Sequence, residues 1–220
     1  MENSLLVLTA PRAIIFDWDD TLVDTWPFLW RLYQETFALF GYTLTKLMNE
    51  KVCREKAVRG GQQTFIDVMG EDRGLRAREY FLTTYGTTFI HEINPLPGAE
   101  TTLKSLKMKG IPMGVVSNKS SAFLKHEITT LGWDHYFKAV VGPDVVGPKP
   151  SAAPLLHALS EMRLDASSNI WFIGDSPVDH ETARNAGCYS IGFGMVEHEP
   201  DVSVADWQSF KVLCSQFHWH

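Results

Sequence analysis

An apolar run at residues 13–16 leads directly into two aspartates, Asp17 and Asp19. The run predicts a short strand, and strand side chains alternate between two faces, so Asp17 and Asp19 are expected on one face and Trp18 on the other. Neighbouring carboxylates repel each other, so a cation, a raised pKa or nearby basic side chains must offset the repulsion. The pattern indicates either a site for chemistry or an acidic turn after a buried strand.

Between residues 23 and 93, large apolar side chains recur at helical spacing without a convincing strand pattern. We therefore predict helices at residues 26–40, 44–58, 63–69 and 75–90. The next residues, Asn94-Pro95-Leu96-Pro97-Gly98, carry prolines too close together for a helix interior and are typical of a rigid connector. A helical block thus separates the first strand from the rest of the chain.

From residue 98 onward, short apolar runs alternate with helical patterns. The predicted strands are residues 113–116, 138–141, 169–173 and 189–193, and the predicted helices are residues 99–109, 121–131, 151–162, 179–186 and 206–217. Such alternation is typical of a parallel sheet, and strands that are apolar throughout indicate helices on both faces. The first strand must join this sheet to bury its apolar run. We therefore expect an α/β fold: a Rossmann-like core domain formed by residues 1–22 and 94–220, with residues 23–93 inserted as an α-helical cap domain.

Composition narrows the possible partners. The 220 residues are 45% hydrophobic and 21% charged, as in an ordinary globular protein. The formal net charge of -6 disfavours nucleic acid or an anionic membrane as a partner, because both reward basic patches. Three widely spaced cysteines favour a reducing compartment, and no run reaches the ~20 apolar residues of a membrane helix, so we expect a cytoplasmic protein. Both a monomer and a homodimer stay open.

Three later loops carry polar side chains where a predicted strand ends, which is the position at which open α/β sheets bind ligands. These side chains are Ser117 and Asn118 in the first loop, Lys149 in the second, and Asp175 and Asp179 in the third. Each group has an ordinary explanation by itself: a helix cap, a solvated lysine, an acidic turn. Their joint occurrence at one sheet edge, beside the two acids of the first strand, favours a functional site.

The set resembles the haloacid dehalogenase-like superfamily, whose four motifs occur here in order and span nearly the whole chain. They are Asp17-Trp18-Asp19-Asp20-Thr21, Ser117, Lys149, and Gly174-Asp175 together with Asp179. The helical insertion, Pro97-Gly98 and the Val115-Val116-Ser117-Asn118-Lys119 run look most like the phosphoglycolate phosphatase branch. The resemblance implies a Mg²⁺-dependent phosphatase that acts on a small phosphorylated metabolite, with a phosphoglycolate-like substrate as the first expectation.

The resemblance also implies roles for the motif residues. Asp17 would attack phosphorus and form an aspartyl-phosphate, which divides one difficult displacement into two easier ones. Asp19 would protonate the leaving oxygen and then activate the water that hydrolyses the intermediate, while Lys149 would neutralise charge on the phosphoryl group. The implied substrate-binding residues are Thr21, Ser117, Asn118 and Lys149. The implied Mg²⁺ ligands are the carboxylates of Asp17 and Asp175, the backbone carbonyl of Asp19, and Asp179 directly or through water.

An acid at position 19 separates the chemistries of this superfamily, because expelling an alkoxide needs a proton donor and expelling a halide does not. Asp19 therefore disfavours a dehalogenase, and it also disfavours a phosphonate-cleaving enzyme, which would be expected to lack that acid. Two alternatives to a phosphatase stay open. One is a phosphomutase of the β-phosphoglucomutase type, which passes the phosphoryl group to a sugar hydroxyl, and the other is a non-catalytic protein that binds phosphate or a partner.

Asp20 is the clearest departure from the family pattern, because phosphoglycolate phosphatase-like proteins usually have glycine there. We expect Asp20 to point away from the metal and to cap the following turn. Within the predicted cap, Arg54 and Arg59 could reach an anionic leaving group, although arginine on a solvated helix face is commoner. Aromatic residues of the cap such as Trp26 are expected to pack and not to surround the substrate.

Overall fold

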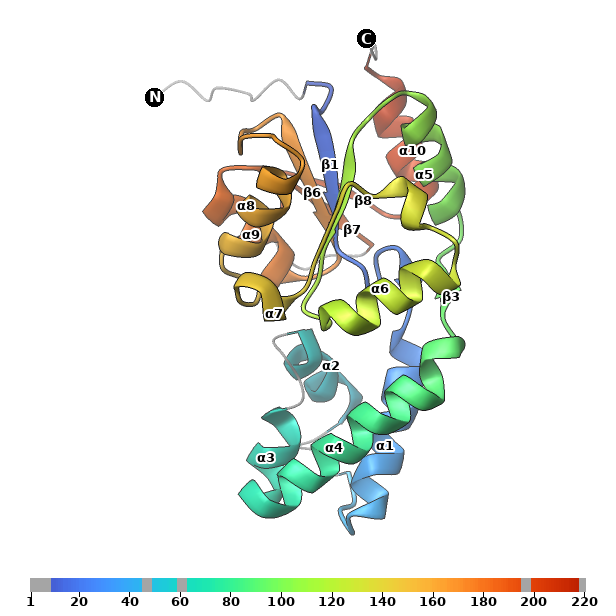
Figure 1. Cartoon of the computed structure of the whole chain (residues 1–220), viewed down its shortest axis with the longest axis vertical. Helices are drawn as coiled ribbons and strands as arrows, with labels where there is room; N and C mark the ends of the chain where they lie inside the picture. Colours follow the sequence, from blue (N-terminus) through green and yellow to red (C-terminus); the bar gives the residue numbers. More distant parts are fainter. Residues whose placement is uncertain (1–8, 45–48, 59–62, 195–198, 218–220) are drawn as a thin grey trace.

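The computed structural model describes residues 9–44, 49–58, 63–194 and 199–217. Across these ranges, six parallel strands form one sheet in the order β5-β4-β1-β6-β7-β8 (Figure 1). They are β1 (Ala13–Phe16), β4 (Met113–Val116), β5 (Ala139–Val141), β6 (Ile170–Gly174), β7 (Tyr189–Phe193) and β8 (Val202–Val204). β1 pairs with β4 on one side and with β6 on the other. The predicted parallel sheet is confirmed, and the strand that precedes the two aspartates lies inside it.

Helices cover both faces of this sheet, because β1 sends alternate side chains to opposite sides. Ile14 and Phe16 pack in one apolar cluster, while Ala13 and Ile15 pack in another, and all four are fully buried. The first cluster takes side chains from α5 (Ala99–Met108), α6 (Ser121–Thr130) and α10 (Trp207–Ser215), and the second from α8 (Ala153–Glu161) and α9 (Pro177–Ala186) (Figure 1). The expected α/β architecture, with helices on both faces, is therefore present.

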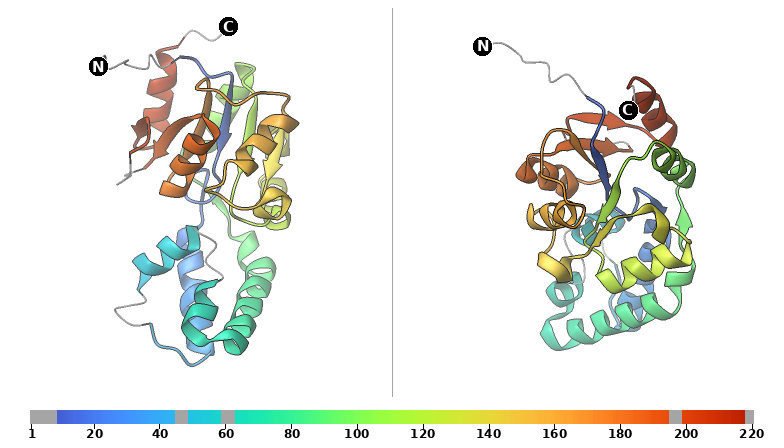
Figure 2. Two further views of the ribbon diagram at one scale, coloured as in Figure 1. Left: turned by 90° about the vertical axis from the view of Figure 1, so that its left-hand side faces the viewer. Right: turned by 45° about the horizontal axis from the view of Figure 1, so that its top comes forward.

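A helical segment lies beyond one end of the sheet (Figure 2). It consists of α1 (Trp26–Leu39), α2 (Glu50–Val58), α3 (Gln63–Met69) and α4 (Glu71–Thr87). The segment has an apolar core of its own, in which Tyr33, Phe65 and Phe81 lie with ring centroids 4.8 to 5.4 Å apart. The chain enters it through β2 (Val23–Asp24) and leaves it through β3 (Asn94–Pro95), which pair antiparallel. A block of helices thus lies between β1 and β4 in the chain, and its role as a separate cap domain stays a prediction.

The structure differs from the prediction mainly in short elements. β2, β3, β8 and α7 (Pro143–Val146) were not predicted, because these short segments mix polar residues or proline with apolar ones and are too short to show a hydrophobic period. Two single turns of 3-10 helix also occur, at Phe89–His91 and Asp134–Tyr136. In β3, Pro95 is tolerated because the strand belongs to a two-stranded edge pair.

Two helices of the segment begin at residues other than those predicted. α4 begins at Glu71 and so includes Gly74, where an added Cβ would lie 2.4 Å from the Ile66 Cα. That glycine allows close contact between α3 and α4, although by itself it indicates a helix break. α2 begins at Glu50, and residues 45–48 of the predicted helix lie outside the described residues.

Within the described part of the chain, the helices are all too short or too polar to cross a membrane. The cytoplasmic location stays a prediction.

Candidate active site

Asp17 and Lys149 meet at the edge of the sheet. Asp17 follows β1 directly, and its backbone N–H donates to the Ile173 carbonyl oxygen at 2.8 Å, so the sheet fixes its backbone. The Lys149 Nζ lies 2.7 Å from the Asp17 Oδ1, with the two side chains only 4% and 9% exposed. The same Nζ donates to the Asp179 Oδ1 at 2.6 Å. A lysine from the loop after β5 is thus placed against an aspartate that follows β1, as expected for the carboxyl edge of a parallel sheet.

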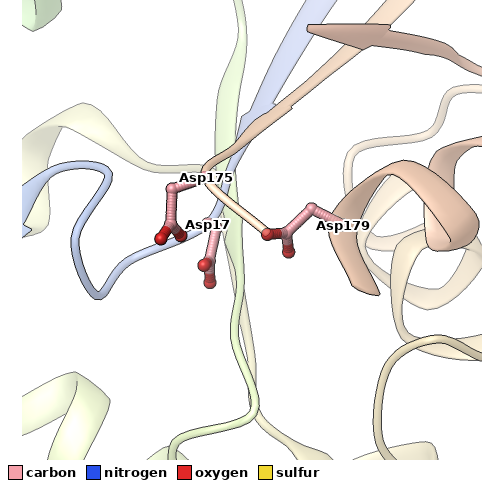
Figure 3. Close-up of side chains that lie close together, drawn as sticks. All are labelled: Asp17, Asp175 and Asp179. Carbon is pink, nitrogen blue, oxygen red and sulfur yellow. The ribbon is translucent and has the colours of Figure 1, made fainter. Parts of the chain in front are cut away.

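Three of the predicted metal-binding carboxylates converge (Figure 3). Asp17, Asp175 and Asp179 each offer a carboxylate oxygen within 4.8 Å of the others. Asp179 is fixed in the first turn of α9, where its Oδ2 accepts hydrogen bonds from the backbone N–H and the hydroxyl of Ser176. Gly174 makes room for this carboxylate, because an added Cβ would lie 2.3 Å from the Asp179 Cγ. The Gly-Asp-Ser-Pro turn therefore packs two acids against the end of β1.

The cluster holds more negative charge than its lysine can neutralise. Burial raises the pKa of Asp17 to about 7, the Asp179 carboxylate adds to the rise, and Lys149 opposes it. Burial, followed by the charges of Asp17 and Asp179, raises the pKa of Asp175 well above its usual value. Both shifts show that the ionised cluster is costly in this environment and that an added cation would stabilise it.

The donor set fits Mg²⁺, which prefers carboxylate and carbonyl oxygen. Both oxygens of Asp179 already accept hydrogen bonds, one from Lys149 and one from Ser176, which suits a supporting role beside the ion. Among the described residues, the Asp175 carboxylate has longer contacts, at 3.5 Å to the Thr21 hydroxyl and 3.8 Å to the Arg54 guanidinium. The Asp19 side chain is not part of this carboxylate group, and the contribution of its backbone carbonyl stays a prediction.

Asp19 forms an ion pair with a different lysine from the one that contacts Asp17. The Lys119 Nζ lies 2.6 Å from the Asp19 Oδ1 and 2.8 Å from the Glu127 Oε2. Glu127 is fully buried and also accepts hydrogen bonds from the Trp18 indole, at 2.6 Å, and from the Tyr85 hydroxyl of α4. This network ties the side chain of Asp19 to α6 and to the helical segment.

The sequence analysis did not single out Lys119 or Glu127, although it carried a signal for the latter. In α6, the buried residues Leu124 and Ile128 lie on the same face as Glu127. A carboxylate on an apolar helix face requires a charged or hydrogen-bonding partner. Burial raises the pKa of Glu127, while Lys119 lowers it. What the sequence could not show is that the partner would be the lysine beside Asp19.

The other predicted substrate-binding residues, Ser117, Asn118 and Thr21, have different surroundings. Ser117 is nearly buried at the end of β4, and its Oγ accepts from the Lys119 N–H at 3.1 Å, which leaves the hydroxyl proton to donate. Asn118 accepts from the Lys149 N–H at 2.8 Å and donates to the Lys149 carbonyl at 3.2 Å, so it holds the lysine loop. Thr21 needs correction: it is fully buried with its hydroxyl toward Asp175, and it does not line the pocket described below.

Asp20 caps the start of α1, as expected. Its Oδ1 accepts from the backbone N–H groups of Trp26 at 3.1 Å and Thr25 at 3.3 Å. Its Oδ2 accepts from the Arg54 guanidinium at 2.8 Å, and that guanidinium lies 5.5 Å from the centre of the Trp26 ring. The expectation for Arg59 falls outside the described residues. Asp20 therefore joins the loop after β1 to α1 and α2 through its side chain, which glycine lacks.

One pocket of about 160 Å³ connects these residues with the helical segment. The predicted site residues that line it are Asp17, Asp19, Ser117, Asn118, Lys149 and Asp175. Its opposite side comes from α1, α2 and α4. The arrangement places a buried carboxylate, a lysine and a hydroxyl at one end of a cavity that a small molecule can enter.

Comparison with known proteins identifies the family. The model of the haloacid dehalogenase-like hydrolases matches residues 14–193, and the chain belongs to this family. A phosphoglycolate phosphatase from Yersinia pestis is 33% identical over 193 residues, which cover 83% of this chain and 81% of that protein. Another, from Nitrosococcus oceani, is 30% identical over 227 residues, which cover 96% and 99% of the two chains.

A solved structure agrees with this family. The crystal structure of a hydrolase of the same superfamily from Ehrlichia chaffeensis matches with a TM-score of 0.66 at 26% identity, covering 94% of this chain and 98% of that one. Within the family, the chain is a phosphatase of the phosphoglycolate phosphatase-like branch. The resemblance stated from the four motifs is confirmed.

Proposed function

We propose that this chain is a Mg²⁺-dependent phosphatase that hydrolyses a small phosphorylated metabolite through an aspartyl-phosphate. The observation that carries the proposal is a buried Asp17 carboxylate, 2.7 Å from Lys149, in the same pocket as Asp19. Phosphate monoesters are extremely slow to hydrolyse in water, so a catalyst must supply a positioned nucleophile and strong charge stabilisation. These three side chains are suited to supply both.

In the first step, an Asp17 oxygen attacks phosphorus, the bond to the leaving oxygen breaks, and Asp19 gives that oxygen its proton. In the second step, Asp19 accepts a proton from water, the water oxygen attacks phosphorus, and phosphate leaves with Asp17 restored. Lys149 and the Ser117 hydroxyl donate hydrogen bonds to the phosphoryl oxygens throughout. Lys119 orients the Asp19 carboxylate from its contact at 2.6 Å.

Mg²⁺ would be held by Asp17 and Asp175, with the Asp19 backbone carbonyl and with Asp179 in support. When bound, it would neutralise negative charge on the phosphoryl group and on the cluster. Lys149 keeps Asp17 and Asp179 in place from the other side, at 2.7 and 2.6 Å.

The names of the curated relatives make 2-phosphoglycolate the first substrate to test. We also propose that residues 23–93 act as a cap domain that closes over the pocket and excludes water. The proposal rests on the pocket walls that α1, α2 and α4 contribute and on the separate apolar core of the helical segment.

The test is phosphate release from a panel of phosphorylated metabolites and p-nitrophenyl phosphate, with Mg²⁺ and with a chelator. We expect release that requires Mg²⁺ and that the Asp17→Asn variant loses. If a sugar phosphate is isomerised and no phosphate is released, the protein is a phosphomutase and not a phosphatase. A folded protein that turns over no substrate, p-nitrophenyl phosphate included, would instead be a binding protein.

A further inference from the structure

The side of the pocket that would face the leaving group is apolar. Of the described residues that line the pocket, those contributed by α1 and α4 are Trp26, Leu29, Tyr33, Phe81, Leu82 and Tyr85, and Phe123 joins them from α6. Phe123 and Tyr85 lie with ring centroids 5.0 Å apart. A leaving group attached to a phosphoryl group at Asp17 would therefore meet aromatic and aliphatic side chains.

Among the described residues that line the pocket, the cations already have carboxylate partners. Three described lining residues are basic, namely Lys149, Lys119 and Arg54. Lys149 contacts Asp17 and Asp179, and Lys119 contacts Asp19 and Glu127, all within 2.8 Å. Arg54 is the basic residue among them that comes from the helical segment, and Asp20 binds its guanidinium at 2.8 Å.

An anionic leaving group would be poorly accommodated here. Its carboxylate would lose water against the apolar wall, and burying an ionised group without a paired cation is costly. Arg54 has further N–H donors, but Asp20 at 2.8 Å already offsets its positive charge, so it adds little stabilisation for a second carboxylate. Electrostatics and the apolar wall thus favour a leaving group without charge.

We propose that the pocket selects phosphate monoesters of small uncharged apolar alcohols or phenols over 2-phosphoglycolate. The inference rests on the proposed phosphatase activity and narrows its substrate class. It assigns selectivity to the wall formed by α1 and α4, and it gives Asp20 the role of neutralising Arg54.

The test compares kcat/KM for isobutyl phosphate and 2-phosphoglycolate in the presence of Mg²⁺. The two leaving groups have similar shapes, since a branched pair of methyl groups replaces the carboxylate. Isobutoxide is also the poorer leaving group, so a preference for it must come from the pocket. We expect isobutyl phosphate to be preferred by at least about tenfold, the usual effect of a few apolar groups in a fitted pocket.

A matched pair of variants locates the selectivity. Leu82→Arg adds a cation to the pocket wall, whereas Leu75→Arg makes the same change on the same helix at a side chain that is 45% exposed and outside the pocket. We expect Leu82→Arg to shift the ratio toward 2-phosphoglycolate by about fivefold and Leu75→Arg to leave it unchanged. Thermal melting of both variants checks their folding.

Equal or better hydrolysis of 2-phosphoglycolate by the unmodified protein would overturn the inference and leave the phosphatase intact. A ratio that Leu82→Arg does not move, in a folded variant, would also overturn the role of the wall. No phosphate release from either ester or from p-nitrophenyl phosphate would overturn the phosphatase as well.

Discussion

At the scale of single residues, the two acids of the first loop are divided between two lysines. Lys149 neutralises Asp17, and Lys119 neutralises Asp19, at 2.7 and 2.6 Å. The two acids lie in one pocket, yet each has its own basic partner. Such separate pairing orients the two carboxylates independently, which the proposed division into nucleophile and proton shuttle requires.

The Lys149→Met variant tests the first pair. It should retain the fold but lower kcat by about a hundredfold to a thousandfold, because one charged donor to the phosphoryl group is removed. Steady-state kinetics measure the loss. Lys138→Met is the matched control, since Lys138 is an exposed lysine immediately before β5, at the opposite end of that strand from the site. Comparable losses in both variants would argue against the role given to Lys149.

Asp20 offers a second test, because its Oδ1 accepts hydrogen bonds from the start of α1 while its Oδ2 binds Arg54. Asp20→Gly should lower the free energy of unfolding by about 1 kcal/mol, since two N–H groups at the start of α1 lose their acceptor. The backbone φ of 55° at this position favours glycine and reduces that loss. Urea unfolding measures the difference.

Asp20→Asn separates the capping role of this residue from its charge. The amide oxygen can still accept from α1, so stability should stay within about 0.5 kcal/mol, while the freed Arg54 should improve hydrolysis of 2-phosphoglycolate relative to isobutyl phosphate. An unchanged substrate ratio in Asp20→Asn and Asp20→Gly alike would show that Asp20 does not control Arg54.

At the scale of elements, α4 and α6 are joined through the buried carboxylate of Glu127. Glu127 of α6 accepts from Tyr85 of α4, from Lys119 and from Trp18. The contact joins the helical segment to α6 beside Lys119, which also contacts Asp19. It also gives the segment a polar anchor that its apolar core does not supply.

Glu127→Gln should lower the free energy of unfolding by about 3 kcal/mol, because it leaves the buried Lys119 ammonium with one charged partner fewer. Tyr85→Phe removes only one hydrogen bond from the same carboxylate and should cost about 1 kcal/mol. Denaturant unfolding of the two variants gives the comparison. A loss below about 0.5 kcal/mol for Glu127→Gln would mean that the pair is not an anchor.

The sequence predicts secondary structure well where the hydrophobic pattern is clear, and it predicts remote side-chain contacts poorly. Uniformly apolar runs predicted β1, β4 and β6, because both faces of those strands are buried, and helical periodicity predicted the helices between them. Because ligands bind beyond the carboxyl ends of parallel strands, the sequence also predicted that Asp17 and Lys149 lie close together. The contact between Arg54 and Asp20 joins residues 34 positions apart and has no local pattern, so only the structure reveals it.

At the scale of the whole molecule, the acidic cluster should couple stability to pH and to Mg²⁺. The pKa of Asp17 is raised from 3.8 to about 7, mainly by burial. Between these values the folded state keeps a proton that the unfolded chain has lost, so stability without metal should fall as pH rises from about 4 to 7. Mg²⁺ binds the deprotonated carboxylates and should reverse that fall.

Thermal melting at pH 5 and pH 7.5, with and without Mg²⁺, measures this coupling. The increase in Tm that Mg²⁺ produces should be larger at pH 7.5, and Asp17→Asn should reduce the difference between the two pH values. An equal or larger Mg²⁺ effect at pH 5 would contradict the assignment of the metal to these carboxylates.

The central claim is that Asp17 is phosphorylated during turnover, and trapping the intermediate tests it most directly. In the Asp19→Asn variant, p-nitrophenyl phosphate should still phosphorylate the protein, because nitrophenolate leaves without a proton, while hydrolysis of the intermediate slows. Borohydride reduction followed by mass spectrometry should then find homoserine at position 17, and Asp17→Asn should show none. Modification at another residue, or unmodified Asp17 in protein quenched during turnover, would contradict the account.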